Sequence, residues 1–233
     1  WACVMDAPHT PIPSLPPKTW RGHSQGPDLD RLATWKLIGF WVGNGWTREG
    51  EQVVICDDVD SGSRLRRLAR DAGLTGSLSA QRTTARFTIG SKRFAVWLRE
   101  HFGSSALTKT VPSWLLGASV EILEAFMVGL LRADGHIARQ KIGGGRIRCL
   151  TTTSRALAVG VRIIFNRLGQ SASITRHDVV RRCIIEGREV RERGFYRVTA
   201  YERARSFRFG RGFGWGKVRT VRPTGQRRTV YNI

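Results

Sequence analysis

The chain has few cysteines, few acidic residues and no long run of hydrophobic residues. Its four cysteines, at positions 3, 56, 149 and 183, lack the paired spacing or neighbouring histidines of a structural zinc site. We therefore expect free thiols in an intracellular protein of the cytoplasm or nucleoid. No segment has the pattern of a signal peptide or a membrane-spanning helix. Because Trp1 is not a methionine, we expect an excised domain, a trimmed chain or a processed product.

Acidic residues are strongly outnumbered: 39 Lys and Arg face 18 Asp and Glu, a net charge of +21. Residues 1–135 hold 16 basic and 13 acidic residues, whereas residues 136–233 hold 23 and 5. Such an excess favours a polyanion, because neutralised phosphates release counterions. The basic residues are mostly arginine, which suits bidentate phosphate and guanine contacts. An RNA-binding protein or a solvated basic surface would show the same charge, so composition does not select DNA.

Two segments of the chain resemble each other: Leu37-Ile-Gly-Phe-Trp-Val-Gly-Asn-Gly45 and Met127-Val-Gly-Leu-Leu-Arg-Ala-Asp-Gly135. Each has small residues at its third and seventh positions, four residues apart. Such residues share one face of a helix, so two helices of this kind can pack with their backbones close together. The small residues are Gly39 and Gly43 in the first copy, and Gly129 and Ala133 in the second.

Each copy ends with a polar residue and a glycine, the residue that best tolerates a left-handed exit from a helix. We therefore expect Asn44 and Asp134 to emerge side by side at one end of the helix pair. That end is a candidate metal site.

The periodicity predicts an α+β fold in which the order helix, two strands, helix, two strands, helix occurs in both halves of the chain. A proline-rich irregular arm is expected over residues 1–30, repeats over 31–118 and 119–216, and a tail over 217–233. The first repeat is expected to contain a helix from Arg31 to Gly43 capped by Asp30, strand Gln52–Cys56, helix Arg64–Ala72 capped by Ser61 and ended by Gly73, strand Arg82–Ile89 and helix Ser91–His101. The second is expected to contain a helix capped by Ser119 and running to Ala133, strands His136–Lys141 and Arg146–Thr151, helix Ser154–Leu168, and strands Ser173–Arg176, Val179–Ile185 and Phe195–Ala200.

The paired motifs resemble those of the LAGLIDADG homing endonucleases, and more closely their intein-associated branch. Lys109-Thr-Val-Pro-Ser-Trp114 resembles the lysine-x-aliphatic-proline segment that precedes the second motif there. Thr152-Thr-Ser154 resembles the strand-to-helix step that comes after the motif. Val230-Tyr-Asn-Ile233 resembles the start of a C-terminal intein segment. Two copies of a motif with matching flanks are more specific than either copy alone.

The resemblance implies two pseudo-symmetric αββαββα repeats with saddle-shaped DNA-binding sheets. It also implies a monomeric, site-specific DNA endonuclease that binds a long asymmetric duplex target with Mg²⁺ or Mn²⁺. A parent intein or host protein would be a further partner. Splicing by the chain itself is not expected, because it lacks an N-terminal nucleophile and a C-terminal His-Asn. The alternative function is a catalytically inactive LAGLIDADG-derived module that binds DNA or RNA in the manner of a maturase.

Phosphodiester hydrolysis needs an activated water and a stabilised leaving oxygen, which divalent cations on carboxylates can supply. Asp134 suits this role, although a helix-terminal aspartate can also simply bind nearby backbone. Asn44 stands where the family has its other acid, so we expect impaired or single-strand cleavage. The amide has three explanations: a degenerate site, a natural nicking variant or an engineered change. The implied metal site comprises Asp134, Asn44, Gly43 and Ala133.

Two lysines are candidates to polarise water or to neutralise the transition state. Lys109 precedes the second motif, and Lys217 resembles its symmetry-related counterpart. Either can instead be a surface or phosphate-contacting lysine. Basic residues on the expected sheets are candidates for reading bases in the major groove, with phosphate contact or plain exposure as the alternative. These candidates are Arg48, Arg82, Arg86, Arg139, Lys141, Arg146, Arg148, Arg176, Arg181 and Arg182.

Overall fold

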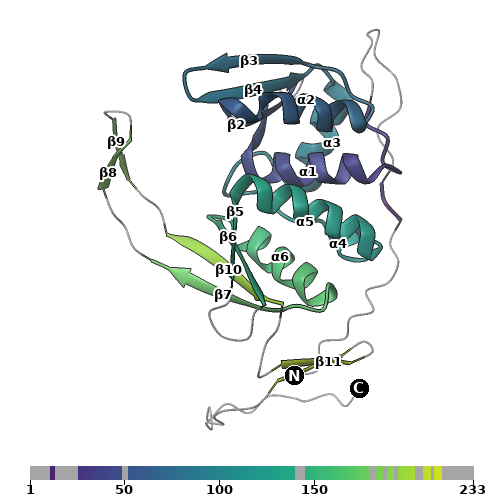
Figure 1. The fold of residues 1–233 in the computed structure, drawn as a ribbon, viewed down its shortest axis with the longest axis vertical. Helices are drawn as coiled ribbons and strands as arrows, with labels where there is room; N and C mark the ends of the chain where they lie inside the picture. Colours follow the sequence, from purple (N-terminus) through teal and green to yellow (C-terminus); the bar gives the residue numbers. More distant parts are fainter. Residues whose placement is uncertain are drawn as a thin grey trace.

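Two helices of similar sequence lie side by side at the centre of the molecule, with a sheet on either side of them (Figure 1). They are α1 (Leu32–Asn44) and α5 (Val120–Asp134), and each is followed by a four-stranded antiparallel sheet. The fold is therefore α+β, as predicted. The computed structural model describes residues 11–13, 26–48, 52–139, 145–178, 182–185, 188–191, 194–202, 207–210 and 213–216.

The helix pair packs backbone against backbone, as the small residues predict. A methyl group on Gly39 would collide with the carbonyl oxygen of Phe126, and one on Gly129 with that of Lys36. A methyl group on Gly43, the next small residue along α1, would collide with the methyl group of Ala133. The repeated glycines are thus required by the distance between the two helices.

The two repeats share one sheet topology. The first sheet has the order β1-β2-β4-β3 and the second has the order β5-β6-β10-β7. In each, the strand that leaves the central helix lies at one edge, and a helix separates the second strand from the third. The first repeat comprises α1, β1 (Gly45–Arg48), β2 (Gln52–Asp58), a short 3-10 turn (Val59–Ser61), α2 (Gly62–Asp71), β3 (Ser77–Gln81), β4 (Thr84–Ile89), α3 (Lys92–Phe102) and α4 (Ser113–Leu116).

The second repeat contains strands that have no counterpart in the first. A two-stranded ribbon, β8 and β9, stands between β7 and β10, and a hairpin of β11 and β12 comes last. The closing helix predicted for this repeat is not found in the part of the chain that the structure describes. The elements are α5, β5 (Gly135–Arg139), β6 (Arg146–Thr152), α6 (Arg155–Arg167), β7 (Ser171–His177), β8 (Arg182–Ile185), β9 (Arg188–Arg191), β10 (Phe195–Tyr201), β11 (Phe207–Gly210) and β12 (Phe213–Gly216).

One continuous hydrophobic core joins both repeats through the helix pair. It includes Trp35 and Trp41 of α1, Phe126 of α5, Phe87 of the first sheet and Phe165 of α6, all almost fully buried. The end of the helix pair is therefore fixed by core packing from both sides. No helix among the described residues is long and apolar enough to cross a membrane.

Two predicted helix starts are wrong. Arg31, not Asp30, occupies the N-cap position of α1 and provides no side-chain cap. The carboxylate of Asp28 instead accepts bonds from the Asp30 amide and the Arg31 side chain. Helix α2 begins at Gly62 rather than Arg64, because a 3-10 turn leads straight into it, and Ser61 caps it only by position. The predicted Ser119 cap of α5 is confirmed, since its side chain accepts from the Ile122 amide.

The predicted left-handed exit at the two motif glycines is also wrong. Gly45 has φ −123° and Gly135 has φ −98°, both extended. Glycine is needed there for space, because a methyl group on Gly45 would meet the Trp41 ring and one on Gly135 the backbone of Leu131.

The predicted strand that began at Arg82 starts at Thr84 instead. Arg82 has φ 45° and lies in the turn between β3 and β4. No residues were assigned from sequence to the short strands β1 and β3, nor to β9, β11 and β12.

We expect Gly39→Ala to destabilise the protein by about 1–3 kcal/mol, because the added methyl group forces the two helices apart. Urea unfolding followed by circular dichroism measures the change. Gly90→Ala is the matched control, since a methyl group there meets nothing within 4 Å and the backbone is not left-handed. An equal loss of stability in both variants would contradict the tight helix contact.

Candidate active site

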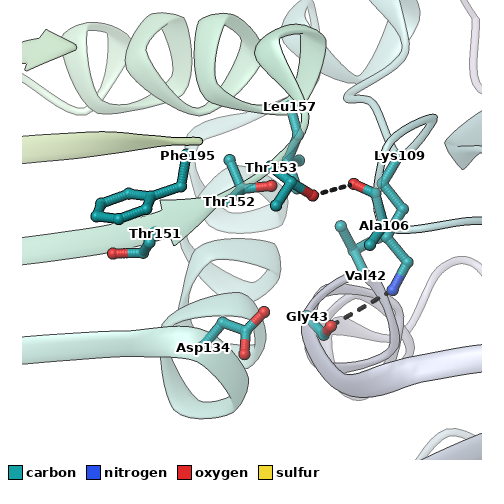
Figure 2. A pocket seen from close by; sticks show the side chains of 10 residues that line it. All are labelled: Val42, Gly43, Ala106, Lys109, Asp134, Thr151, Thr152, Thr153, Leu157 and Phe195. Carbon is teal, nitrogen blue, oxygen red and sulfur yellow. Dashed lines mark hydrogen bonds between the residues drawn. The ribbon is translucent and has the colours of Figure 1, made fainter. Parts of the chain in front are cut away.

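A cavity of about 510 Å³ opens where α1 and α5 end. Asp134 enters it from the end of α5, opposite Gly43 on α1 and three consecutive threonines at the end of β6 (Figure 2). The described lining is Val42, Gly43, Ala106, Lys109, Asp134, Thr151, Thr152, Thr153, Leu157 and Phe195.

Asp134 carries the carboxylate of this cavity. The side chain is exposed at the rim, and Figure 2 shows it pointing into the cavity. The protein atoms packed around the carboxylate raise its pKa, and the positive charge of Lys109 opposes that rise. The two groups are therefore electrostatically coupled across the cavity.

Lys109 is almost completely buried, with 6% of its surface exposed. Its ammonium group donates to the carbonyl oxygens of Trp41 at 3.0 Å, Gly45 at 2.8 Å and Gly43 at 3.4 Å. These three acceptors use its three N–H bonds. Trp41 and Gly43 belong to the last turn of α1 and Gly45 is its C-cap, and the Trp41 carbonyl also accepts from the Gly45 amide. Lys109 therefore caps α1 by a side chain from a distant loop.

These hydrogen bonds limit the role that the sequence predicted for Lys109, which was to polarise water or to neutralise the transition state. A group with three carbonyl acceptors has no N–H left for a water or phosphate. Burial lowers the pKa of Lys109 from 10.5 to about 8, and Asp134 opposes this shift. The group is thus still mainly charged at neutral pH. Ser154 fixes the backbone here, since its hydroxyl donates to the Lys109 carbonyl at 2.6 Å.

Asn44 lies in a different cavity, of about 340 Å³, on the other side of the helix pair's end. Its amide donates to the carbonyl oxygen of Ala133 at 3.1 Å, so it is tied to the opposite helix. The two motif ends therefore face two separate cavities, rather than one shared site. The second cavity is lined by Asn44, Cys56, Asp57, Asp58, Thr84, Arg132 and Ala133.

The donor set of the Asp134 cavity suits a hard divalent cation. Its lining includes one carboxylate, at Asp134, and three threonines. The Thr152 hydroxyl accepts from the Ser154 amide and the Thr153 hydroxyl donates to the Ala106 carbonyl, so Asp134 and Thr151 are the better candidate oxygen ligands. Mg²⁺ keeps several waters, so one carboxylate in a roomy cavity is compatible with it. A site enclosed by protein ligands is absent from the described residues, where no group of three or more His, Cys, Asp or Glu could hold a metal.

The candidate DNA-contacting residues do not share one surface. Arg86 lies on β4 opposite the buried Ala85 and Phe87, so it is on the open face of the first sheet, with its guanidinium 5.6 Å from the Trp46 ring centre. Arg146 and Arg148 share a face of β6 with the buried Leu150. Four others are exposed: Arg48 on β1, Arg82 in a turn, Arg139 on β5 and Arg182 on β8. Arg176 on β7 forms an ion pair with Asp178 at 2.6 Å. Lys141, Arg181 and Lys217 lie outside the described residues.

Sequence reasoning missed a second open-face arginine. Arg197 alternates with the buried Val198 on β10 and lies opposite Thr151, as Arg86 lies opposite Cys56 in the first sheet. Its guanidinium also lies near an aromatic ring, 5.8 Å from the centre of Phe195. The alternation along β10 was the available signal. Asp57, Asp58 and Arg132 were missed because only their three-dimensional neighbours mark them.

Comparison with known proteins finds a family match in the second repeat. A family model described as a LAGLIDADG-like domain matches residues 121–197, from α5 into β10. The second repeat is therefore similar to a LAGLIDADG-like domain.

Two curated relatives extend the similarity over more of the chain. It is 30% identical over 154 residues to the ATP-dependent DNA helicase Hel308 of Thermococcus kodakarensis, covering 61% of this chain and 13% of that protein. It is 26% identical over 184 residues to the homothallic switching endonuclease of Saccharomyces cerevisiae, covering 66% of this chain and 30% of that protein. The chain thus spans less than a third of either relative.

Among solved structures, I-DmoI in complex with DNA and Ca is similar to this chain. The identity is 16% and the TM-score is 0.47, with 72% of this chain and 82% of that chain covered.

The pKa of Lys109 predicts how stability depends on pH. An unfolded lysine keeps its proton to about 10.5, whereas the folded one loses it above about 8, so the unfolded state binds more protons in between. Stability should therefore rise between these pH values, by roughly 3 kcal/mol at most.

The measurement is urea unfolding at several pH values for the unmodified protein and for Lys109→Met. The rise should be absent in Lys109→Met and retained in Lys36→Met, which removes an exposed lysine of α1. Parallel pH profiles for the unmodified protein and Lys109→Met would contradict a lowered pKa.

Proposed function

We propose that this chain is a metal-dependent DNA endonuclease that cuts one strand of a long asymmetric duplex site. The observation that carries the proposal is Asp134, a carboxylate at the rim of a cavity, at the end of a helix in the segment that matches a LAGLIDADG-like domain. The name of the yeast relative, a switching endonuclease, supports the same reaction class.

The residues of the Asp134 cavity would bind and orient the reacting groups. Asp134 and the hydroxyl group of Thr151 would hold Mg²⁺ or Mn²⁺, which supplies Lewis acidity and an acidic bound water. Lys109 holds the end of α1 in place, and its charge stabilises the ionised form of Asp134. We assign Lys109 to positioning, because its N–H bonds are already used.

The open faces of the two sheets are the proposed DNA surface. Arg86 and Arg197 occupy equivalent places on these faces, and each lies near an aromatic ring, which limits its conformational freedom. The surplus of basic residues after residue 135 supports binding through phosphates. One chain holds both repeats, so we propose that it acts as a monomer.

We also propose that the chain derives from an intein. The matched part is 13% of a helicase and 30% of an endonuclease, which is typical of a segment inserted into unrelated hosts. The motif flank at Lys109 supports the same branch of the family.

A second candidate function is an inactive DNA- or RNA-binding module. The observation that favours it is the Asn44 amide, which is bonded to Ala133 rather than available as a charged ligand. A plasmid cleavage experiment separates the two functions.

We expect nicked but not linear product from a supercoiled plasmid that bears the target site, with Mg²⁺ present. The site is first selected from a library of random duplexes by binding to the protein. EDTA and Asp134→Asn should each abolish nicking, because both remove the cation. Asp71→Asn, an exposed carboxylate change on α2, is the matched control and should cut normally. Tight binding without any nick would support the binding module instead.

Arg86→Gln and Arg197→Gln should each weaken DNA binding and reduce the salt slope of log K by about 1. Fluorescence anisotropy at several salt concentrations measures both quantities. Arg70→Gln on α2 is the control, because that helix packs on the opposite face of the first sheet. A change of slope in the control alone would place the DNA on the helix side.

A further inference from the structure

The cavity beside Asn44 is built from the same positions of the repeat as the cavity beside Asp134. The strand registers establish this, because Gly45 pairs with Ile55 in the first sheet as Gly135 pairs with Leu150 in the second. Each cavity combines the polar end of one central helix with the last turn of the other. The equivalent residues are Asp134 and Asn44, Val42 and Arg132, Gly43 and Ala133, Thr151 and Cys56, Thr152 and Asp57, Thr153 and Asp58, and Phe195 and Thr84.

The two cavities differ in charge at the position of Arg132. Its equivalent, Val42, is apolar and 1% exposed. Arg132 is exposed on α5, and one guanidinium nitrogen donates to the Ser61 hydroxyl at 3.4 Å. Within the part of the chain that the structure describes, no carboxylate forms an ion pair with it. A guanidinium with donors to spare therefore lines the Asn44 cavity.

The Asn44 amide changes the same cavity in a second way. Its N–H group donates to the Ala133 carbonyl, which is the equivalent of the Gly43 carbonyl in the other cavity. An aspartate at this position would have no N–H to donate, and it would add a negative charge. Asn44 thus omits the carboxylate that a cation prefers. The carbonyl bonds do not distinguish the two cavities, because the Gly43 carbonyl accepts from Lys109.

The strand residues of this cavity are acidic. Asp57 and Asp58 stand where the other cavity has threonines, and one oxygen of Asp57 is buried without a hydrogen-bond partner among the described residues. A positive charge is therefore favoured in this cavity, and Arg132 is the cation that the chain itself provides there.

We propose that Arg132 supplies a fixed positive charge in the Asn44 cavity and so keeps a divalent cation out of it. The proposal deepens the proposed function, on which it rests, by assigning the uncut strand to this cavity. A guanidinium can bind a phosphate, but it has no bound water to activate. The second strand would accordingly be held without being cut. Loss of the motif acid is then only half of the difference between the two cavities.

The proposal predicts that Asn44→Asp alone does not restore double-strand cleavage. The guanidinium would pair with the new carboxylate, and the cation would still meet a positive charge. Asn44→Asp combined with Arg132→Val reproduces the two corresponding positions of the Asp134 cavity. We expect second-strand cleavage to rise roughly 100-fold from the single to the double variant, the size of effect that one charge-stabilising group has in an active site.

The decisive measurement counts bound Mn²⁺ by electron paramagnetic resonance on the chain with its target duplex. We expect one ion for the unmodified chain and for Asn44→Asp, and two for Asn44→Asp/Arg132→Val. Asn44→Asp/Arg132→Lys, which keeps the charge, should bind one, as should Asn44→Asp/Arg70→Val, which removes an unrelated arginine. Circular dichroism confirms that each variant is folded.

Three outcomes would overturn the proposal. The first is a second ion bound by Asn44→Asp alone. The second is a single ion on the folded double variant. The third is a second ion on the unmodified chain that Asp57→Asn removes, since the strand acids would then hold a cation despite Arg132. Failure of the proposed function has a different signature: no strand of an end-labelled duplex is cut, and Asp134→Asn leaves the ion count unchanged.

Discussion

The close contact between α1 and α5 is the constraint on which the rest of the structure depends. Gly39 and Gly129 bring each helix against carbonyl oxygens of the other, so the two backbones are held at a distance that no side chain could set. At that distance the last turn of each helix reaches the cavity of the other. Each cavity is therefore shared between repeats, and a change in one helix alters the chemistry beside the end of its partner.

The end of α1 shows how the fold satisfies a helix terminus inside a core. The carbonyls of Trp41, Gly43 and Gly45 converge at a buried point. The Trp41 carbonyl accepts from the Gly45 amide, but further donors are needed because a buried carbonyl left unpaired is costly. Lys109 resolves this by bringing three N–H donors from outside the helix. The lysine in turn is desolvated, and the negative charge of Asp134 compensates part of that cost. Helix end, lysine and carboxylate form one interdependent unit, so the geometry of the candidate site and its stability cannot be separated.

Sequence was sufficient for features that depend on local pattern or on repetition. The small residues of the motif predicted the helix contact, and periodicity predicted α1, α5, α6 and the central strands. It failed where one specific side-chain contact, rather than a periodic pattern, decides the conformation. Asp28, not Asp30, orders the start of α1 through its contacts with the next turn of the chain, and the extended Gly45 is required by the Trp41 ring rather than by its own torsion angle. The aligned motifs already match Arg132 with Val42, but only the folded chain shows that Arg132 lines the Asn44 cavity.

The asymmetry of the two cavities follows from charge considered over each whole cavity rather than at one residue. In the first, a carboxylate at the helix end stands with neutral strand residues, so it can attract a cation that also contacts solvent or phosphate. In the second, the helix end is neutral, the strand end is acidic, and an arginine also lines the cavity. Replacing Asn44 by an acid would increase the negative charge without removing the competing guanidinium. A cavity changed at several positions in compensating directions is adapted to hold its own cation, and its chemistry cannot be restored through the motif residue alone.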